Sequence, residues 1–301
     1  MTRKLSGLTP LEIKGNDTKP TLIAASPVIS IRQALKTMSI HNITSLPIYS
    51  HDSKNIVNIV NFVDVLYYVT EKVVAGENLP NHLKDSKLDD HIEAVMTLDT
   101  ERESYRILKT DANDNIKSLL EAFSRGIHRS LVIDYTNKTE PYILTQTDII
   151  RYVYAHPESL PSIDFDSSLK SLGLAEKKHE VVVGYDNEIA LNLYRRMSEK
   201  NLTGIPIINS EEKLIGNLSV SDLRGLSYES IENLALPVLK FLETLSNSET
   251  SLNAISVSEH ASLREVLRLI VTNRIHRVWI VSEDCKVRGI VSLTDLIQLF
   301  S

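Results

Sequence analysis

The sequence is poor in the residues that disulfides, fibres and flexible linkers need. It has a single cysteine, Cys285, which excludes an intrachain disulfide and a multi-cysteine metal site and suits a reducing compartment. Ten glycines and ten prolines among 301 residues are too few for a fibrous or broadly disordered protein. With 42% hydrophobic residues, the chain is long enough for about two domains with substantial cores.

Long apolar runs and an excess of positive charge are missing as well. No stretch approaches the roughly 20 apolar residues of a membrane-spanning helix, and the first twenty residues lack the apolar segment of a secretory signal. The net charge of −6 argues against a sequence-independent nucleic-acid binder, although it leaves room for a local basic pocket. We predict a soluble cytoplasmic protein, with a nuclear location left open, that has neither a membrane nor a nucleic acid as partner.

The usual catalytic and metal-binding motifs are also absent. The sequence contains no G-x-G-x-x-G, G-x-x-x-x-G-K-[ST] or G-x-S-x-G segment, and these are the patterns that hold phosphates or a nucleophilic serine. Nine histidines occur without the spacing of a metal site. We therefore expect no enzymatic activity, no metal and no cofactor.

What the chain has instead is a fourfold repeat. Four apolar strands each end in a polar residue that is followed, three positions later, by an aspartate. These signature segments are Asn61–Asp64, Thr145–Asp148, Ser219–Asp222 and Ser292–Asp295. The final aspartate lies 17 residues after a position in a preceding apolar strand in the first two repeats, and 16 residues in the last two. Such regular spacing determines the architecture before any single motif is considered.

The last repeat shows the order of elements most clearly. An apolar run at 254–257 predicts a short strand, and residues 262–270 show the apolar spacing of a helix. Two further strands are predicted at 278–281 and 287–291, and Ser292 opens a helix that continues through Phe300. The repeat therefore reads strand, helix, strand, strand, helix.

The same order recurs three times earlier in the chain. The other repeats extend over 22–69, 105–154 and 181–226, with their first helices at 31–40, 116–123 and 189–198. A unit of about 50 residues exposes too much apolar surface to be stable alone, so we expect the repeats to pair. Polar stretches lie at 76–90, 157–167 and 246–251. The middle one contains two prolines, and we predict that it separates two modules of two consecutive repeats.

These segments resemble the cystathionine-beta-synthase (CBS) domain, which pairs into a Bateman module. The similarity extends over about residues 20–301 and is strongest in Gly126–Asp134, Tyr142–Asp148, Ile275–Val281 and Gly289–Asp295. It implies an α/β fold of four CBS repeats, paired into two Bateman modules that form a pseudo-fourfold disc. The corresponding domains are an N-terminal tail at 1–19 and CBS repeats at 20–75, 92–156, 170–228 and 250–301.

Four such repeats without a catalytic domain resemble the gamma subunit of AMP-activated protein kinase and its fungal and plant relatives. This resemblance implies a non-catalytic regulatory subunit that binds AMP, ADP or ATP and modulates a protein kinase in energy sensing, with catalytic and scaffold subunits as partners. Related fungal proteins are linked to a phosphatase and plant proteins to other partners. The alternative is therefore an adaptor or regulator of another partner, such as a protein phosphatase, with weak or no nucleotide binding.

The signature aspartates have two interpretations. A Ser or Thr followed three residues later by an acid is a capping box, in which both side chains bond backbone amides at the start of a helix. The CBS resemblance implies, in addition, that Asp64, Asp148, Asp222 and Asp295 bind the two ribose hydroxyls of a nucleotide, a role that suits two acceptor oxygens. It also assigns the signature hydroxyls of Thr145, Ser219 and Ser292 to nucleotide binding. In repeat one Asn61 replaces the hydroxyl, although Asn also caps helices. Capping and ribose binding are compatible with each other.

Two His-Arg pairs are more specific. His128-Arg129 and His276-Arg277 occupy equivalent positions just before the second strand of repeats two and four. A single arginine is most often a solvated charge in a loop. Two identical His-Arg pairs at matching positions favour a functional role instead. Arginine matches phosphate oxygens bidentately, and histidine adds a donor whose charge follows pH. The resemblance implies that these four residues converge on nucleotide phosphates.

The chain also departs from the gamma subunit. Thr44 and Thr203, which the resemblance also assigns to nucleotide binding, stand at the aligned positions of repeats one and three. The first is arginine in the gamma subunit, and Thr147 replaces a lysine. These changes remove up to two cations, so discrimination by phosphate number is expected to be weak. Conversely, Asp148 is present where the animal gamma subunit has an arginine and an unused site. Outside the repeats, we interpret the apolar run at 234–242 as core rather than as a docking surface, and Trp279 as core.

Overall fold

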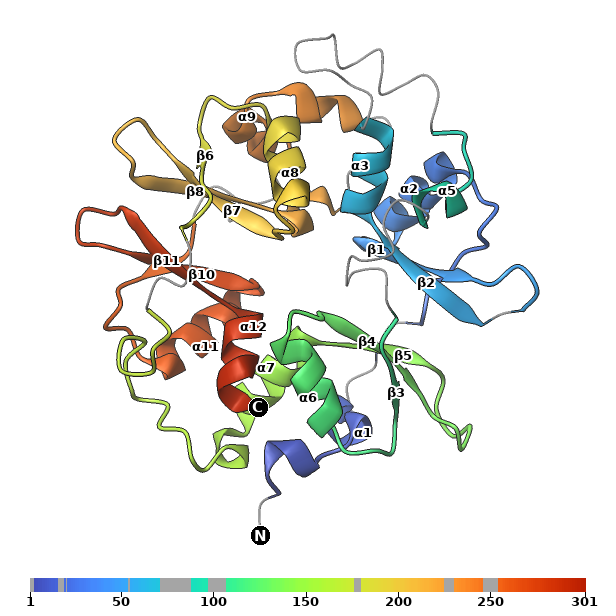
Figure 1. Cartoon of the computed structure of the whole chain (residues 1–301), viewed down its shortest axis with the longest axis horizontal. Coiled ribbons are helices and arrows are strands. Elements are labelled where there is room, and N and C mark those ends of the chain that lie inside the picture. Colours follow the sequence, from blue (N-terminus) through green and yellow to red (C-terminus); the bar gives the residue numbers. More distant parts are fainter. Residues whose placement is uncertain are drawn as a thin grey trace. The chain divides into compact units, whose positions relative to one another are not determined.

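The computed structural model describes residues 3–15, 19, 21–53, 55–70, 88–96, 107–175, 180–224, 230–245 and 254–301. Most of the polar stretch at 76–90 and all of that at 246–251 lie outside these residues. Figure 1 shows small sheets with helices beside them, which is the α/β class that the sequence predicts. Within the described ranges, no helix combines the length and the apolar character needed to cross a membrane.

Repeat four has the predicted order of elements. It consists of β9 (Ser256–Val257), α11 (Leu263–Asn273), β10 (Arg277–Val281), β11 (Val287–Ser292) and α12 (Leu293–Phe300). Strand β10 lies in the middle of the sheet, parallel to β9 and antiparallel to β11. The hydroxyls of Ser262 and Ser292 accept backbone amides at the starts of α11 and α12, so each helix begins at a capping residue.

Repeat two is built in the same way. Its elements are β3 (Lys109–Asp111), α6 (Lys117–Ser124), β4 (Arg129–Ile133), β5 (Tyr142–Thr145) and α7 (Gln146–Ala155). Strand β4 is again central, parallel to β3 and antiparallel to β5. The two repeats are thus confirmed as copies of one supersecondary unit.

Repeats one and three keep this plan with one change each. Repeat one contains α2 (Ile31–Ile40), β1 (Ser45–Tyr49), β2 (Ile56–Asn61) and α3 (Phe62–Thr70). Repeat three contains β6 (Gly184–Tyr185), α8 (Ala190–Glu199), β7 (Gly204–Ile208), β8 (Leu214–Ser219) and η4 (Val220–Leu223). In repeat one an isolated parallel bridge from Ala25 to Ile48 replaces the first strand. In repeat three the signature opens a short 3-10 helix, because the backbone is already extended at Arg224.

The first helix of every repeat ends in the same turn. The first or second residue after the helix has a positive φ, and the next apolar residue donates its amide to a carbonyl five residues back, over 2.7–3.2 Å. The positive-φ residues are Asn42, Gly126, Asn201 and Arg274. This is a Schellman turn, for which Gly and Asn are the favoured residues.

Short elements connect the repeats. They are η1 (Leu5–Gly7), α1 (Pro10–Lys14), α5 (Glu93–Met96), η3 (Pro157–Ser159), η5 (Ile231–Ala235) and α9 (Val238–Thr244). The apolar run at 234–242 forms the end of η5 and most of α9, and its side chains Leu234, Val238 and Phe241 are fully buried. Trp279 is also buried. Both core interpretations are confirmed.

The chain divides into two compact units that alternate along the sequence. Unit one contains Met1–Leu22, Ile107–Val181 and Ile255–Ser301, and unit two contains Ile23–Arg106 and Val182–Ala254. Repeats two and four therefore share unit one, where α12 packs against α6 and α7 and α11 packs against α7. Repeats one and three share unit two, where α3 packs against α8.

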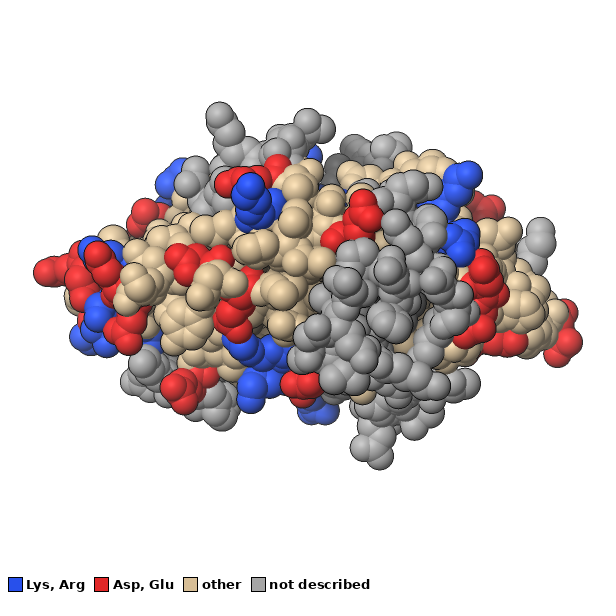
Figure 2. All heavy atoms as spheres, turned by 90° about the horizontal axis from the view of Figure 1, so that it is seen from above, with Lys and Arg blue, Asp and Glu red and all other residues tan. Residues whose placement is uncertain are grey.

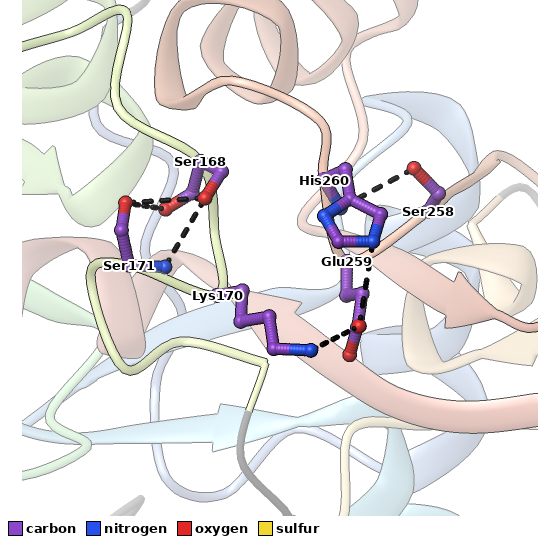
Figure 3. Close-up of polar contacts among 6 residues, drawn as sticks. All are labelled: Ser168, Lys170, Ser171, Ser258, Glu259 and His260. Carbon is purple, nitrogen blue, oxygen red and sulfur yellow. Dashed lines mark hydrogen bonds and ion pairs between the residues drawn. The ribbon is translucent and has the colours of Figure 1, made fainter.

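The segment that the sequence marks as a boundary, 157–167, lies inside unit one rather than between two units. Leu160 and Phe165 are buried in the core of that unit. The segment after it is fixed to repeat four: the amide of Lys170 donates to the carbonyl of Glu259 over 3.0 Å, and its Nζ lies 2.7 Å from a carboxylate oxygen of Glu259 (Figure 3). Two prolines therefore mark a bend of the chain here and not a break between compact units.

The N-terminal arm, defined here as residues 3–15 together with Lys19, also belongs to unit one. Leu5, Leu8 and Ile13 are buried in its core, and the amide of Ile116 donates to the carbonyl of Leu8 over 2.8 Å. The sequence predicted a tail here because no repeat begins before residue 20. The apolar side chains of the arm instead extend the core that repeats two and four share.

We expect Leu5→Ala to lower the free energy of unfolding of unit one by about 2–5 kcal/mol, the usual cost of this truncation in a packed core. Trp279 is the only tryptophan and lies in unit one, so its fluorescence in a urea titration reports that unit selectively. Ser6→Ala, at the exposed neighbouring position, is the control. Equal midpoints for wild type and Leu5→Ala would contradict a structural role of the arm.

Candidate functional site

One hydrogen bond places the candidate phosphate-binding position at the start of the signature helix in every repeat. The second residue of each signature donates its backbone amide to the carbonyl of the residue that precedes the central strand. The bonds join Phe62 to Thr44 (2.9 Å), Gln146 to His128, Val220 to Thr203 and Leu293 to His276 (3.1 Å each). The four acceptor residues are therefore structurally equivalent, as the sequence alignment of the repeats predicted.

The signature aspartates cap these helices through one carboxylate oxygen. Oδ2 accepts the backbone amide of the residue three positions earlier in every repeat. The donors are Asn61 (3.0 Å), Thr145 (2.8 Å), Ser219 (2.7 Å) and Ser292 (2.8 Å). In repeats two and four the hydroxyl of Thr145 or Ser292 donates to the same oxygen. In repeat three the Ser219 hydroxyl instead accepts the amide of Ser221. The capping interpretation is confirmed.

In repeats two and four the cap uses only Oδ2 of Asp148 and Asp295. In repeat four, no other group among the described residues bonds the carboxylate of Asp295. In repeat two, Oδ1 of Asp148 lies 2.5 Å from Nζ of Lys19. In unit two, Asp64 is buried and Asp222 is half-buried. The geometry of Asp295 thus allows capping and ribose binding at the same time.

The structure brings His128, Arg129 and Arg277 together in unit one. Arg129 opens β4 and Arg277 opens β10, and Arg277 is buried with 8% of its surface exposed. The pKa of His128 falls from its ordinary value of 6.5 to about 4, because surrounding protein atoms desolvate the ring and the charges of Arg129 and Arg277 repel a proton. The side chain nevertheless reaches solvent, so an anion has access to it. His276, half-buried, occupies the position equivalent to His128.

Unit two has no counterpart of these cations at the equivalent positions. Thr44 and Thr203 stand where unit one has its histidines, and Ser45 and Gly204 stand where it has its arginines. Thr203 is exposed and Thr44 is half-buried. Burial and, after it, the negative charge of Asp222 raise the pKa of Tyr194 in unit two. Unit one is therefore the better candidate for binding a phosphate.

Sequence reasoning missed two contacts of unit one. Gln146 donates from Nε2 both to the carbonyl of Phe123 and to the hydroxyl of Thr294, over 2.9 Å in each case. The bond to Thr294 directly joins the signature segments of repeats two and four. The second missed residue is Lys19. Neither the bond from Gln146 to Thr294 nor the ion pair of Lys19 with Asp148 has a sequence signal, because each joins residues more than 100 positions apart.

The arginines of the site are set apart by their placement and not by a broad basic surface. On the face that Figure 2 shows, acidic and basic side chains are intermixed. Within the described residues, no group of three or more His, Cys, Asp or Glu side chains has the arrangement of a metal site. Anion binding in unit one would therefore depend on the local pair of arginines.

Comparison with protein families gives one match. The CBS domain family matches residues 17–71, 178–229 and 250–301, which together exceed half of the chain. These segments are repeats one, three and four. Repeat two lies outside the match, but its element order and its carbonyl-to-amide bond are those of the other three.

The chain is similar to plant and fungal proteins along most of its length. It is 24% identical over 276 residues to the "SNF1-related protein kinase regulatory subunit gamma-like PV42a" of Arabidopsis thaliana, covering 81% of this chain and 75% of that protein. It is 22% identical to "Protein SDS23" of Debaryomyces hansenii over 91% of this chain. The chain spans only 55% of the length of that fungal protein.

Two solved structures share the fold. One is a Methanocaldococcus jannaschii protein described as a proposed archaeal homolog of g-AMPK, with a TM-score of 0.70, 17% identity and coverage of 98% of this chain and 100% of that chain. The other is an uncharacterized conserved protein of Pyrococcus horikoshii, with a TM-score of 0.52, 15% identity and coverage of 94% and 97%. At these identities the similarity shows the fold alone.

The lowered pKa of His128 gives a prediction that proton NMR can check. In the free protein the imidazole should titrate with a pKa of about 4 and be neutral at pH 7. Arg129→Gln removes one of the repelling charges, so it should move the pKa of His128 back toward 6.5. The resonance is assigned by its loss in His128→Gln. A pKa of 6.5 in the wild type would contradict the electrostatic description of the site.

Proposed function

The chain belongs to the CBS domain family, and we propose that it is a non-catalytic regulatory protein that binds adenine nucleotides and modulates a partner protein kinase. The observation that carries the proposal is the grouping of His128, Arg129 and Arg277 in unit one. The signature aspartates of repeats two and four, Asp148 and Asp295, belong to the same unit. A nucleotide needs both kinds of group: cations for its phosphates and acceptors for its ribose.

The phosphate would be held by the two arginines. Each guanidinium offers a planar set of donors that fits phosphate oxygens, and repulsion between the two cations is relieved when an anion lies between them. A neutral His128 adds one donor at pH 7. A bound phosphate raises the pKa of His128, so binding becomes stronger with proton uptake as the pH falls through that raised pKa toward the free value of about 4.

The ribose would be held by the carboxylate oxygens that the helix caps leave over. At Asp295 this oxygen is Oδ1, since Oδ2 is already bonded to the amide and hydroxyl of Ser292. The cap fixes the orientation of the carboxylate, so little side-chain freedom is lost when a sugar binds. The ribose role that the family resemblance implies for Asp64 and Asp222 belongs to the same proposal, with the neutral Thr44 and Thr203 at the positions of the histidines.

The protein kinase partner is inferred from similarity to the plant kinase regulatory subunit over 81% of this chain. We place the complex in the cytoplasm, and the nucleus is a second location compatible with it. Thr44 and Thr147 stand where the gamma subunit has cations. Discrimination among AMP, ADP and ATP is therefore expected to be weak.

The alternative is a regulator of another partner, such as a protein phosphatase, with weak or no nucleotide binding. The missing cations and the similarity to the fungal protein over 91% of this chain favour it. The two functions differ in the catalytic chain that co-purifies from native cells: a kinase supports the proposal and a phosphatase supports the alternative. Nucleotide affinity of the purified protein separates them independently.

Replacing both Arg129 and Arg277 by glutamine should weaken AMP binding strongly, because each charge-assisted bond contributes about 1.5–3 kcal/mol. Adenosine has no phosphate and should bind the variant and the wild type equally. Arg268→Gln, at an exposed position of α11, is the matched control, and isothermal calorimetry is the measurement. If AMP binds the double variant as tightly as the wild type, the arginines do not hold phosphate.

Asp295→Asn tests the ribose role against a purely structural one. Asparagine keeps the size and most of the capping ability of aspartate but lacks its charge. We expect adenosine affinity to fall while the melting temperature changes little, and we expect the wild type to prefer adenosine to 2′-deoxyadenosine. A purely structural aspartate would give the opposite pattern, with a lower melting temperature and equal binding of the two nucleosides to the wild type.

A further inference from the structure

Lys19 of the N-terminal arm lies on the signature carboxylate of repeat two. Its Nζ is 2.5 Å from Oδ1 of Asp148, and only 18% of the lysine side chain and 11% of the aspartate side chain are exposed. The other oxygen of Asp148 is bonded to the amide and hydroxyl of Thr145. Both oxygens of this carboxylate therefore have partners within the chain.

Repeat four provides an internal comparison. Asp295 makes the same cap with Ser292, but no cation among the described residues lies on its second oxygen. The two sites belong to one unit and use the same local geometry. They differ because Lys19 has no equivalent at Asp295.

The ammonium group of Lys19 and a ribose hydroxyl would donate to the same acceptor, Oδ1 of Asp148. An ammonium is a donor only, so it satisfies the carboxylate in the way that sugar hydroxyls would. Nζ of Lys19 lies 2.5 Å from Oδ1, and only 11% of the Asp148 side chain is exposed. A ribose therefore has no approach to this oxygen while the lysine is in place. A sugar reaches Asp148 only after the lysine has moved.

The arm keeps Lys19 close to this carboxylate. Leu5, Leu8 and Ile13 anchor the arm in the core of unit one, and Nζ of Lys14 lies over the ring of Tyr142, 5.3 Å from its centre. Lys19 follows five residues after this contact. The tether gives Lys19 a high effective concentration at Asp148, which a free ligand must overcome.

We propose that Lys19 is a tethered competitor for the ribose position of repeat two, so that a nucleoside binds at Asp295 first and at Asp148 only when Lys19 leaves. This inference rests on the proposed function, because it assumes that the signature aspartates bind ribose. It makes the two sites of unit one unequal: the apparent affinity at Asp148 is reduced by the fraction of molecules in which Lys19 is in place.

The test is adenosine binding, measured by equilibrium dialysis in an Asp295→Asn background that removes the competing site of repeat four. Adding Lys19→Ala should raise adenosine affinity about three- to tenfold, the range expected when a partly buried ion pair no longer has to be broken. Lys19→Arg keeps the cation and should leave the affinity low. Lys4→Ala removes an exposed cation from the same arm and should change nothing. The gain must disappear when Asp148→Asn is added.

The results distinguish a failure of the competitor role from a failure of the proposed function. If the wild type binds adenosine and Lys19→Ala leaves affinity in the Asp295→Asn background unchanged or lowers it, the competitor role is wrong while the proposed function stands. A lowered AMP affinity with unchanged adenosine affinity would make Lys19 a phosphate ligand instead. If neither the wild type nor Lys19→Ala binds adenosine or AMP, the proposed function fails and this inference fails with it.

Chemical labelling gives a second measurement that does not depend on variants. An amine-reactive reagent, followed by peptide mass spectrometry, should label Lys19 slowly in the free protein and faster at saturating adenosine, because the sugar displaces the lysine from Asp148. Lys4 is exposed and should be labelled equally in both conditions. Equal labelling of Lys19 with and without adenosine, in protein shown to bind it at Asp148, would overturn the proposal.

Discussion

The repeats depend on one hydrogen-bonded junction, where the central strand and the last helix begin next to each other. A carbonyl before the strand accepts the second amide of the signature, and the aspartate accepts the amide of the first signature residue through Oδ2. These bonds satisfy backbone donors that a helix start otherwise leaves without partners. They also hold the residue before the strand and the signature carboxylate at fixed positions, so one structural solution prepares two kinds of binding group.

Packing of helices decides how the repeats combine. Because α12 lies against α6 and α7, repeats two and four share a core, and both His-Arg pairs fall in the same unit. The bond from Gln146 to Thr294 ties the two signatures within that core. Unit two has the same backbone plan with threonines in place of histidines. The same fold thus has His-Arg pairs at the start of the central strand in repeats two and four and neutral residues at these positions in repeats one and three.

Sequence patterns predicted local structure well and long-range packing poorly. The order of elements, the helix at 31–40 and the cap at Ser292 follow from apolar spacing and capping chemistry, which act within a few residues, so they were confirmed. The sequence predicted modules of two consecutive repeats and an N-terminal tail, whereas the compact units alternate and the arm is buried. An apolar side chain such as Leu5 does not show which core it joins. The ion pair of Lys19 is beyond prediction for the same reason: its partner lies 129 residues away.

The alternation of the units determines how a truncation of the chain would affect each unit. The chain passes from one unit to the other four times, after residues 22, 106, 181 and 254. A chain that stopped after residue 254 would therefore leave repeat two without α11 and α12, the helices of repeat four against which it packs. The same truncated chain would contain every segment of unit two, so the damage would fall on unit one alone.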